Sequence, residues 1–319
     1  MDVIAPVAGR PYALLEATRE SSPLDVPADI IMTLFKAHGA LLLRGFAASV
    51  ANLHPFTAQF CSGSVFNESP DRQSLDAMHN IQSVNAGTLP FPLHPELSRE
   101  PWKPDACFFA CIVPPLAMGA TTVCDGVELV RRLPPGLRDE LARRRLRYVQ
   151  PVSPNILDFW LGTPTPSGAQ LAAPPSHCPY SFGSIDGHVV RVFTRPVLHT
   201  PMFIDAPAFG NFLLFSYFYN RVRGYPSFDD GTFVPDEWLD IIRVTGESLT
   251  AAIAWQAGDL LMLDNSRFLH GRTAVVENDV RLIASYFGYL KDAPVNPEEP
   301  IHPLWRHSDF RPPSRQAAL

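Results

Sequence analysis

Residues 258–272 read GDLLMLDNSRFLHGR and contain two short strands separated by tight turns. The apolar run LLML lies between the turn pairs Gly-Asp and Asp-Asn, a pattern typical of a short strand buried on both faces. The second strand, FLH, is half apolar and ends on His270. Short strands joined directly by turns, with no helix between them, are typical of antiparallel β folds.

The rest of the chain also favours a mainly β fold with helical decoration. Apolar runs predict strands at 106–113 and 280–290, and apolar residues at helical spacing predict helices at 28–38 and 137–147. The predicted strands and helices do not alternate regularly along the chain, so a parallel sheet is not expected. The 33 prolines among 319 residues are roughly twice the usual share and disfavour a helical bundle.

The composition excludes several classes of protein. The net charge is −6, so nucleic-acid binding is not expected. The five cysteines form no CxxC pair, which argues against a disulfide framework and against a structural zinc site. No membrane span is expected, because no apolar stretch approaches 18 residues. The N-terminus has no signal-peptide pattern, so we expect a cytoplasmic protein. The sequence does not indicate an oligomeric state.

One candidate metal-binding element is the triplet His94-Pro95-Glu96. In an extended backbone, residues two apart point to the same side, so His94 and Glu96 could reach one cation together. The pattern is weak alone, because a chain with ten histidines contains about one such triplet by chance. A second triplet, His307-Ser308-Asp309, lies in the proline-rich tail with no strand around it, and we discount it.

His270 completes a set of two histidines and one carboxylate with His94 and Glu96. Such a set leaves three adjacent metal positions open, as non-haem Fe(II) oxygenases require. A zinc hydrolase could use the same ligands. A non-catalytic jelly-roll binding protein would have no reason to bring these residues together. The residues alone leave these alternatives open.

Two long segments carry a family resemblance. Residues 94–134, HPELSREPWKPDACFFACIVPPLAMGATTVCDGVELVRRLP, resemble the corresponding segment of Fe(II)/2-oxoglutarate dioxygenases related to taurine dioxygenase and clavaminate synthase. Residues 255–272, WQAGDLLMLDNSRFLHGR, match the family's distal pattern nearly residue for residue. The metal triplet has glutamate as its carboxylate and continues as H-x-E-x-S at 94–98. In this it is similar to the branch that contains clavaminate synthase and the syringomycin-type aspartyl hydroxylases. The family's G-G-x-T element appears at 119–122, with alanine as its second residue.

The resemblance implies roles for particular residues. His94, Glu96 and His270 would be the iron ligands and catalytic centre. Arg281, on the last predicted strand, would hold the distal carboxylate of 2-oxoglutarate, and Thr122 would add a hydroxyl donor. A guanidinium can bind a carboxylate through two parallel hydrogen bonds. Arg272 is the runner-up for this anion contact, because it lies two residues after His270 on the same strand face.

Two residues near the triplet, Asn85 and Ser98, are candidate substrate contacts. Arg191 and Arg195 lie in the region 150–235, and we expect both to be solvated and outside the site. This region matches the family poorly.

The family fold is a double-stranded β-helix, or jelly roll, and we expect one catalytic domain over 1–319. Its core would span about 38–290, with a specificity insert at about 150–235. The implied cofactors are Fe(II), 2-oxoglutarate as cosubstrate and O2. The implied reaction is hydroxylation at an unactivated C–H bond of an amino-acid-like small molecule, free or carried on a protein, in natural-product or antibiotic biosynthesis. Desaturation or oxidative ring closure is the alternative.

Overall fold

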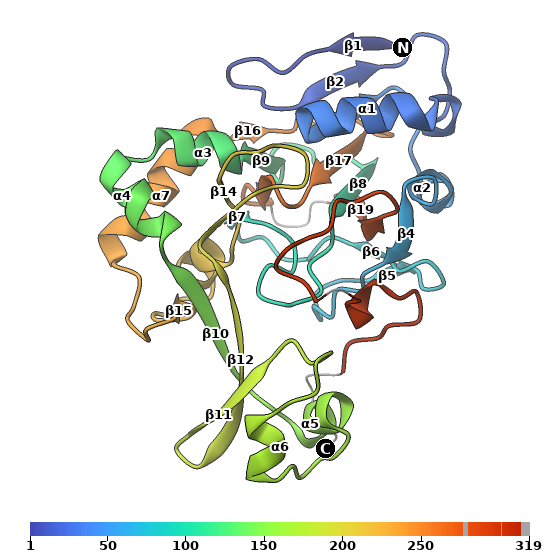
Figure 1. Cartoon of the computed structure of the whole chain (residues 1–319). Helices are drawn as coiled ribbons and strands as arrows, with labels where there is room; N and C mark the ends of the chain where they lie inside the picture. Colours follow the sequence, from blue (N-terminus) through green and yellow to red (C-terminus); the bar gives the residue numbers. More distant parts are fainter. Residues whose placement is uncertain (277–279, 301, 314–319) are drawn as a thin grey trace.

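The computed structural model describes residues 1–276, 280–300 and 302–313. Over these residues the chain is mainly β, with helices packed around the sheets (Figure 1). The strands are β1 (Asp2–Ile4), β2 (Ala13–Glu16), β3 (Ala40–Arg44), β4 (Cys61–Ser64), β5 (Ser74–Asp76), β6 (Ile81–Ser83), β7 (Phe91–His94), β8 (Ala106–Val113), β9 (Thr121–Asp125), β10 (Arg145–Pro151), β11 (Ser181–Ile185), β12 (His188–Pro196), β13 (Leu198–His199), β14 (Ala208–Phe209), β15 (Ser227–Phe228), β16 (Ala251–Ala252), β17 (Leu260–Asp264), β18 (Phe268–Arg272) and β19 (Leu282–Leu290). The helices are α1 (Ala28–His38), α2 (Val50–Thr57), α3 (Gly126–Arg132), α4 (Pro135–Ala142), α5 (Pro154–Leu161), α6 (Gly168–Ala172), α7 (Asp236–Leu249) and the short η1 (Pro23–Asp25), η2 (Phe215–Tyr219) and η3 (Leu304–Arg306).

Two sheets form the body of the described chain. The larger sheet has the order β1-β2-β3-β17-β8-β19-β6-β5, with β4 beside β19, and the smaller has the order β16-β9-β18-β7. Residues 258–272 join them: β17 lies between β3 and β8, and β18 crosses to pair with β9 and β7. The tight turn at 265–267 therefore passes the chain from one sheet to the other.

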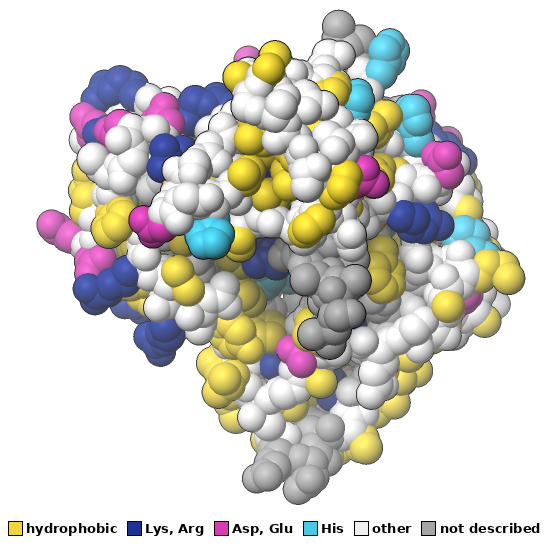
Figure 2. All heavy atoms as spheres, turned by 90° about the horizontal axis from the view of Figure 1, so that it is seen from below, with side chains coloured by type: hydrophobic (Ala, Val, Ile, Leu, Met, Phe, Trp, Pro, Cys, Tyr) yellow, Lys and Arg dark blue, Asp and Glu magenta, His cyan; other side chains and the backbone are white. Residues whose placement is uncertain are grey.

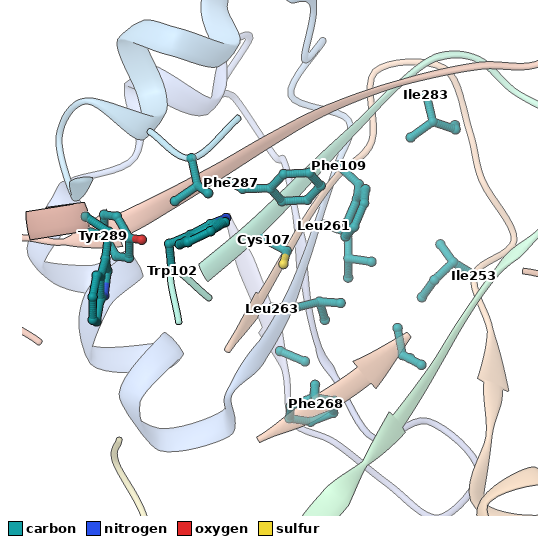
Figure 3. Packing of buried hydrophobic residues seen from close by; sticks show 14 of the residues in the cluster. Trp102, Cys107, Phe109, Ile253, Leu261, Leu263, Phe268, Ile283, Phe287 and Tyr289 are labelled. Carbon is teal, nitrogen blue, oxygen red and sulfur yellow. The ribbon is translucent and has the colours of Figure 1, made fainter. Parts of the chain in front are cut away.

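The inner faces of the two sheets share one apolar core. Figure 3 shows Phe109 of β8, Leu261 of β17 and Phe287 of β19 packed in one cluster with Phe268 of β18 and Ile253. All five side chains are at most 2% exposed. Burial of this many apolar side chains is the main force that holds the sheets face to face.

Helices cover the outer faces of both sheets. Ile31 and Phe35 of α1 pack with Leu41 of β3 on the outside of the larger sheet. Helix α1 ends where predicted, because Gly39 takes a left-handed φ of 73° and stops it. On the smaller sheet, Leu129 of α3 and Ile242 of α7 pack in a separate cluster.

A further sheet, in the order β11-β12-β10-β15, lies mostly in the region 150–235. In Figure 1, β10 and β12 run as a long ribbon away from the two main sheets toward α5 and α6. The helix predicted at 137–147 is wrong in its second half, since α4 ends at Ala142 and β10 begins at Arg145. Leu146 and Tyr148 alternate into the core, and this two-residue period selects a strand. Arg191 and Arg195 on β12 are 2% and 9% exposed, so the expectation that they are solvated is also wrong.

None of the helices in the described ranges is long and apolar enough to cross a membrane. On the face shown in Figure 2, lysine and arginine side chains alternate with acidic ones and form no continuous basic patch.

Candidate functional site

A cavity of about 260 Å³ lies where β7 and β18 meet the inner face of the larger sheet. Its wall combines three kinds of side chain: titratable groups, neutral polar groups and aromatic rings. The main lining residues are Asn67, Ser69, Asp71, Arg72, Asn85, Phe91, His94, Glu96, Arg99, Phe109, Thr121, Phe212, Phe215, Tyr219, Asn220, His270, Arg272 and Arg281. The cavity therefore contains every titratable residue that the sequence singled out for the site.

Two histidines face each other across neighbouring strands of the smaller sheet. His94, the last residue of β7, is the register partner of His270 on β18, and the ring centroids are 4.6 Å apart. Nδ1 of His94 is 2.8 Å from the Pro92 carbonyl oxygen, which leaves Nε2 of His94 available. Among the described residues, Nδ1 of His270 has no hydrogen-bond partner. Both rings are thus held by the sheet with one nitrogen available to a ligand.

Both histidines are neutral near pH 7. Burial lowers the pKa of His94 below its ordinary value of 6.5. Burial, together with the neighbouring His94 and Arg72, holds the pKa of His270 well below that value. A neutral imidazole has a free lone pair, which is the form that binds a metal ion.

Glu96 lies beside the two histidines, with its Oε2 3.9 Å from Nε2 of His270. Its carboxylate already has two polar partners. Asn67 Nδ2 donates to Oε1 at 2.7 Å, and Arg72 Nη2 donates to Oε2 at 3.1 Å. Two ligand atoms that lie about 2.1 Å from one ion and subtend a right angle at it are roughly 3 Å apart. The separation of 3.9 Å is larger, so Glu96 would have to move closer to His270 to share an ion with it.

The backbone around Glu96 is fixed by Asn265, in the turn after β17. The Glu96 amide donates to Asn265 Oδ1 at 2.8 Å, and Asn265 Nδ2 donates to the carbonyls of Glu96 and Pro104 at 3.0 and 2.8 Å. This turn belongs to the stretch that crosses between the sheets. It therefore places His270 on one strand and anchors Glu96 through a side chain.

The residues present fit a two-histidine, one-carboxylate metal site after a movement of the Glu96 side chain. In the described part of the chain, no three His, Cys, Asp or Glu side chains stand in positions that would already hold a metal ion. The two histidines are fixed and neutral, whereas the carboxylate is bound to Arg72 and Asn67. Turning Glu96 from Arg72 toward His270 is the change that would complete the set.

The three residues predicted to bind the cosubstrate, Arg281, Arg272 and Thr122, lie in different surroundings. Arg281 lines the cavity just before β19, with its Cδ 3.2 Å from the position that a Cβ on Gly119 would take. Arg272 also lines it, but its guanidinium donates to the carbonyls of Asn85, Gly87 and Leu89. Arg272 thus holds the segment before β7 in place.

The structure does not bring Thr122 to the cavity. Its neighbour Thr121 lines the wall and is 4% exposed. Thr121 is on the same strand face as Val123, which packs in the core between the sheets. Side chains alternate along a strand, so Thr122 points the other way, where its hydroxyl lies beside Gly271.

The two candidate substrate contacts also differ. Asn85 lines the cavity, but its amide is engaged: Oδ1 accepts from Arg72 Nε at 2.8 Å and Nδ2 donates to Ser69 at 2.6 Å. Ser98 is fully buried and is not part of the cavity wall. Its backbone carbonyl accepts a hydrogen bond from Arg195.

Sequence reasoning missed two groups of site residues. Arg72 and Asn67, the partners of Glu96, lie in the irregular segment between β4 and β5. An aromatic wall comes from η2, where the Phe215 ring centroid is 4.6 Å from that of His94 and 4.8 Å from that of Tyr219. The run LLFSYFY is an aromatic cluster in the sequence, and that signal could have marked it as a candidate wall.

Comparison with known proteins gives a consistent result. The model of the family described as "Taurine catabolism dioxygenase TauD, TfdA family" matches residues 16–286. No curated protein sequence matches the chain significantly.

Solved structures similar to this chain share its fold. PvcB from Pseudomonas aeruginosa has a TM-score of 0.59 and 18% identity, over 92% of this chain and 94% of that one. A taurine dioxygenase from Burkholderia xenovorans has a TM-score of 0.59 and 15% identity, over 94% of this chain and 92% of that one. AAD-2 in complex with Mn(II) and N-oxalylglycine has a TM-score of 0.56 and 11% identity, over 92% of this chain and 100% of that one. The predicted mainly β jelly roll is confirmed.

Proposed function

The chain belongs to the TauD, TfdA family of dioxygenases, and from that premise we propose that it hydroxylates an unactivated C–H bond of an amino-acid-like small molecule. As a member of this family it is an Fe(II)/2-oxoglutarate-dependent dioxygenase that uses O2. The observation that carries the proposal is the pairing of His94 with His270 on adjacent strands, with Glu96 beside them. We assign these three side chains to the iron.

Arg281 and Thr121 are proposed to hold the distal carboxylate of 2-oxoglutarate. Both line the cavity, and Thr121 is fixed by the Trp255 indole, which donates to its hydroxyl oxygen at 3.1 Å. A guanidinium in a part-buried site forms strong, directional hydrogen bonds to a carboxylate. Thr121 therefore replaces Thr122 in this role, and Arg272 remains a support for the segment at 85–89.

When bound, the iron with 2-oxoglutarate and O2 supplies an oxidant able to break an unactivated C–H bond. The protein's own contribution is to position the reactants and to exclude water. Phe109 and Phe215 lie against the rings of His270 and His94, at centroid distances of 5.2 and 4.6 Å. These rings keep bulk water from the two nitrogen ligands on the protein side.

The cavity wall carries groups that suit an amino-acid-like substrate. Asp71 offers a carboxylate and Arg99 a guanidinium, which match the opposite charges of a zwitterion. Arg99 also lies over the Phe212 ring, 5.1 Å from its centroid, so it is placed beside an aromatic surface. A role in natural-product biosynthesis draws support from the similar PvcB structure, which is described as belonging to an isonitrile synthetic pathway.

The test is mass spectrometry of products formed from a panel of amino acids under isotopically labelled O2, with 2-oxoglutarate present and chloride in excess. Hydroxylation predicts a product with one labelled oxygen, formed only when 2-oxoglutarate is present. A product lighter by two hydrogens would replace hydroxylation by desaturation or ring closure. A chlorinated product would show that Glu96 is not an iron ligand, because a halide needs the position that the carboxylate fills.

A further inference from the structure

A second cavity, of about 570 Å³, shares no lining residue with the first. Its wall comes from segments that lie far apart in the chain: 103–105, 195–202 and 294–299, with Ser266 and Arg306. Asn265 connects this wall to the candidate iron site, since its amide binds the carbonyls of both Pro104 and Glu96. The second cavity is thus adjacent to the loop that carries Glu96.

Lys103 lines this cavity and is only partly exposed. Among the described residues its ammonium group makes no hydrogen bond and no ion pair. Burial, followed by the positive charge of Arg195, lowers the pKa of Lys103 to about 7. A cation in this setting lacks the partner that buried charges ordinarily have.

The other charged groups around the cavity do not supply that partner. Arg306 already binds Asp105 and Glu299 with distances of 2.6–2.8 Å at the closest atoms. Glu298 is closest to Arg195, with 3.8 Å between Oε2 and Nε.

Two further titratable groups near the cavity, His199 and Asp264, form no ion pair with Lys103. His199 is neutral, because burial and the nearby Lys103 and Arg195 lower its pKa to about 3. Asp264 is buried, its pKa is raised to about 6, and its Oδ1 accepts hydrogen bonds from Ser266 and Arg267. The cavity is therefore lined by Lys103, which has no ion-pair partner among the described residues, and by Arg195, whose positive charge repels it and whose carboxylate partner Glu298 is 3.8 Å away at the closest atoms.

We propose that this cavity is a binding site for a small oxyanion, a carboxylate or a phosphate, held between the Lys103 ammonium and the Arg195 guanidinium. An anion bound there attracts both cations and offsets the repulsion between them. The part-buried setting strengthens this attraction. Arg195 is 9% exposed and also donates to the carbonyl of Ser98, two residues after Glu96. The bound anion thus contacts a side chain that already holds the iron-site loop.

The chain contains three lysines, Lys36, Lys103 and Lys291, which makes a direct test feasible. Reductive ¹³C-methylation of the full protein gives each lysine its own NMR signal, assigned with the variants Lys103→Gln and Lys36→Gln. Titration with inorganic phosphate and, separately, with succinate distinguishes the two sources of oxyanion. Sodium chloride at equal ionic strength is the control.

The proposal expects saturable shifts of the Lys103 signal and a rise of about one unit in its titration midpoint with at least one oxyanion. Lys103→Gln should weaken calorimetric binding about tenfold or more, and Lys36→Gln should leave it unchanged. Above pH 7 the affinity should fall as Lys103 loses its proton. An unmoved Lys103 signal in both titrations would overturn the proposal, as would equal shifts of all three lysines. The signal in the unsubstituted protein decides the matter even if Lys103→Gln does not fold.

Discussion

Arg72 Nη2 lies 3.1 Å from Oε2 of Glu96, and the two side chains are 6% and 5% exposed. The same guanidinium donates to Asn85 and Ser285 and lies over the Phe287 ring. Arg72 thus neutralises a buried carboxylate at the proposed iron site. An arriving metal ion has to take over that carboxylate, so Arg72 and the metal compete for Glu96.

Arg72→Met should destabilise the metal-free protein and strengthen metal binding. Removing one partner leaves the Glu96 charge buried and unmatched, at a cost of about 3–5 kcal/mol in the free energy of unfolding. Mn(II) can supply the missing positive charge, so its addition should restore more stability in the variant than in the unsubstituted protein. Thermal unfolding with and without Mn(II) measures both effects.

The matched control is Arg131→Met, since that side chain is 61% exposed and its removal should change neither quantity. Equal Mn(II)-dependent increases in Tm for the Arg72→Met and unsubstituted proteins would show that the two cations do not compete.

Arg281→Ala should raise the 2-oxoglutarate concentration needed for half-maximal binding. A charge-assisted contact in a part-buried cavity is lost, which corresponds to about 2–5 kcal/mol. Anaerobic binding titrations measure this directly. Unchanged 2-oxoglutarate affinity would remove Arg281 from the cosubstrate site.

Thr121→Val and Thr122→Val form a matched pair that tests the register of β9. Thr121→Val should weaken 2-oxoglutarate binding about fivefold, the equivalent of one neutral hydrogen bond of about 1 kcal/mol. Thr122→Val should leave the affinity unchanged, because its side chain points away from the cavity. The opposite ranking of the two variants would place Thr122 in the site.

The free energy of unfolding should fall as the pH drops below about 6.5. Burial lowers the pKa of His199 from 6.5 to about 3, so the unfolded state binds a proton in this range and the folded state does not. The contribution of His199 to the free energy of unfolding is therefore fully present above pH 6.5, and up to about 2 kcal/mol of it is lost at pH 5.

Urea unfolding at pH 7.5 and pH 5 measures this loss. His199→Gln should reduce it, whereas His188→Gln, at an exposed position, should not. Equal pH dependence in all three proteins would mean that His199 is not the group responsible.

The sequence predicted the parts of the site that lie in regular structure. His94 and Glu96 are two residues apart beside a strand, and His270 lies within another, so local patterns place them. Arg72 reaches Glu96 from an irregular segment with no periodicity, and only the folded chain brings the two together. The contrast between Thr121 and Thr122 shows a different limit: a shift of one residue along a strand exchanges the faces of the sheet.

The account's central claim is that His94, Glu96 and His270 hold one iron ion with which 2-oxoglutarate associates. The most direct measurement is an anaerobic titration of the metal-free protein with Fe(II) in the presence of 2-oxoglutarate, followed by the visible charge-transfer absorption of the complex. The account predicts saturation at one iron per chain in the unsubstituted protein and loss of the absorption in His94→Ala and His270→Ala, with both variants still folded by circular dichroism. The same absorption and stoichiometry in either folded variant would contradict it.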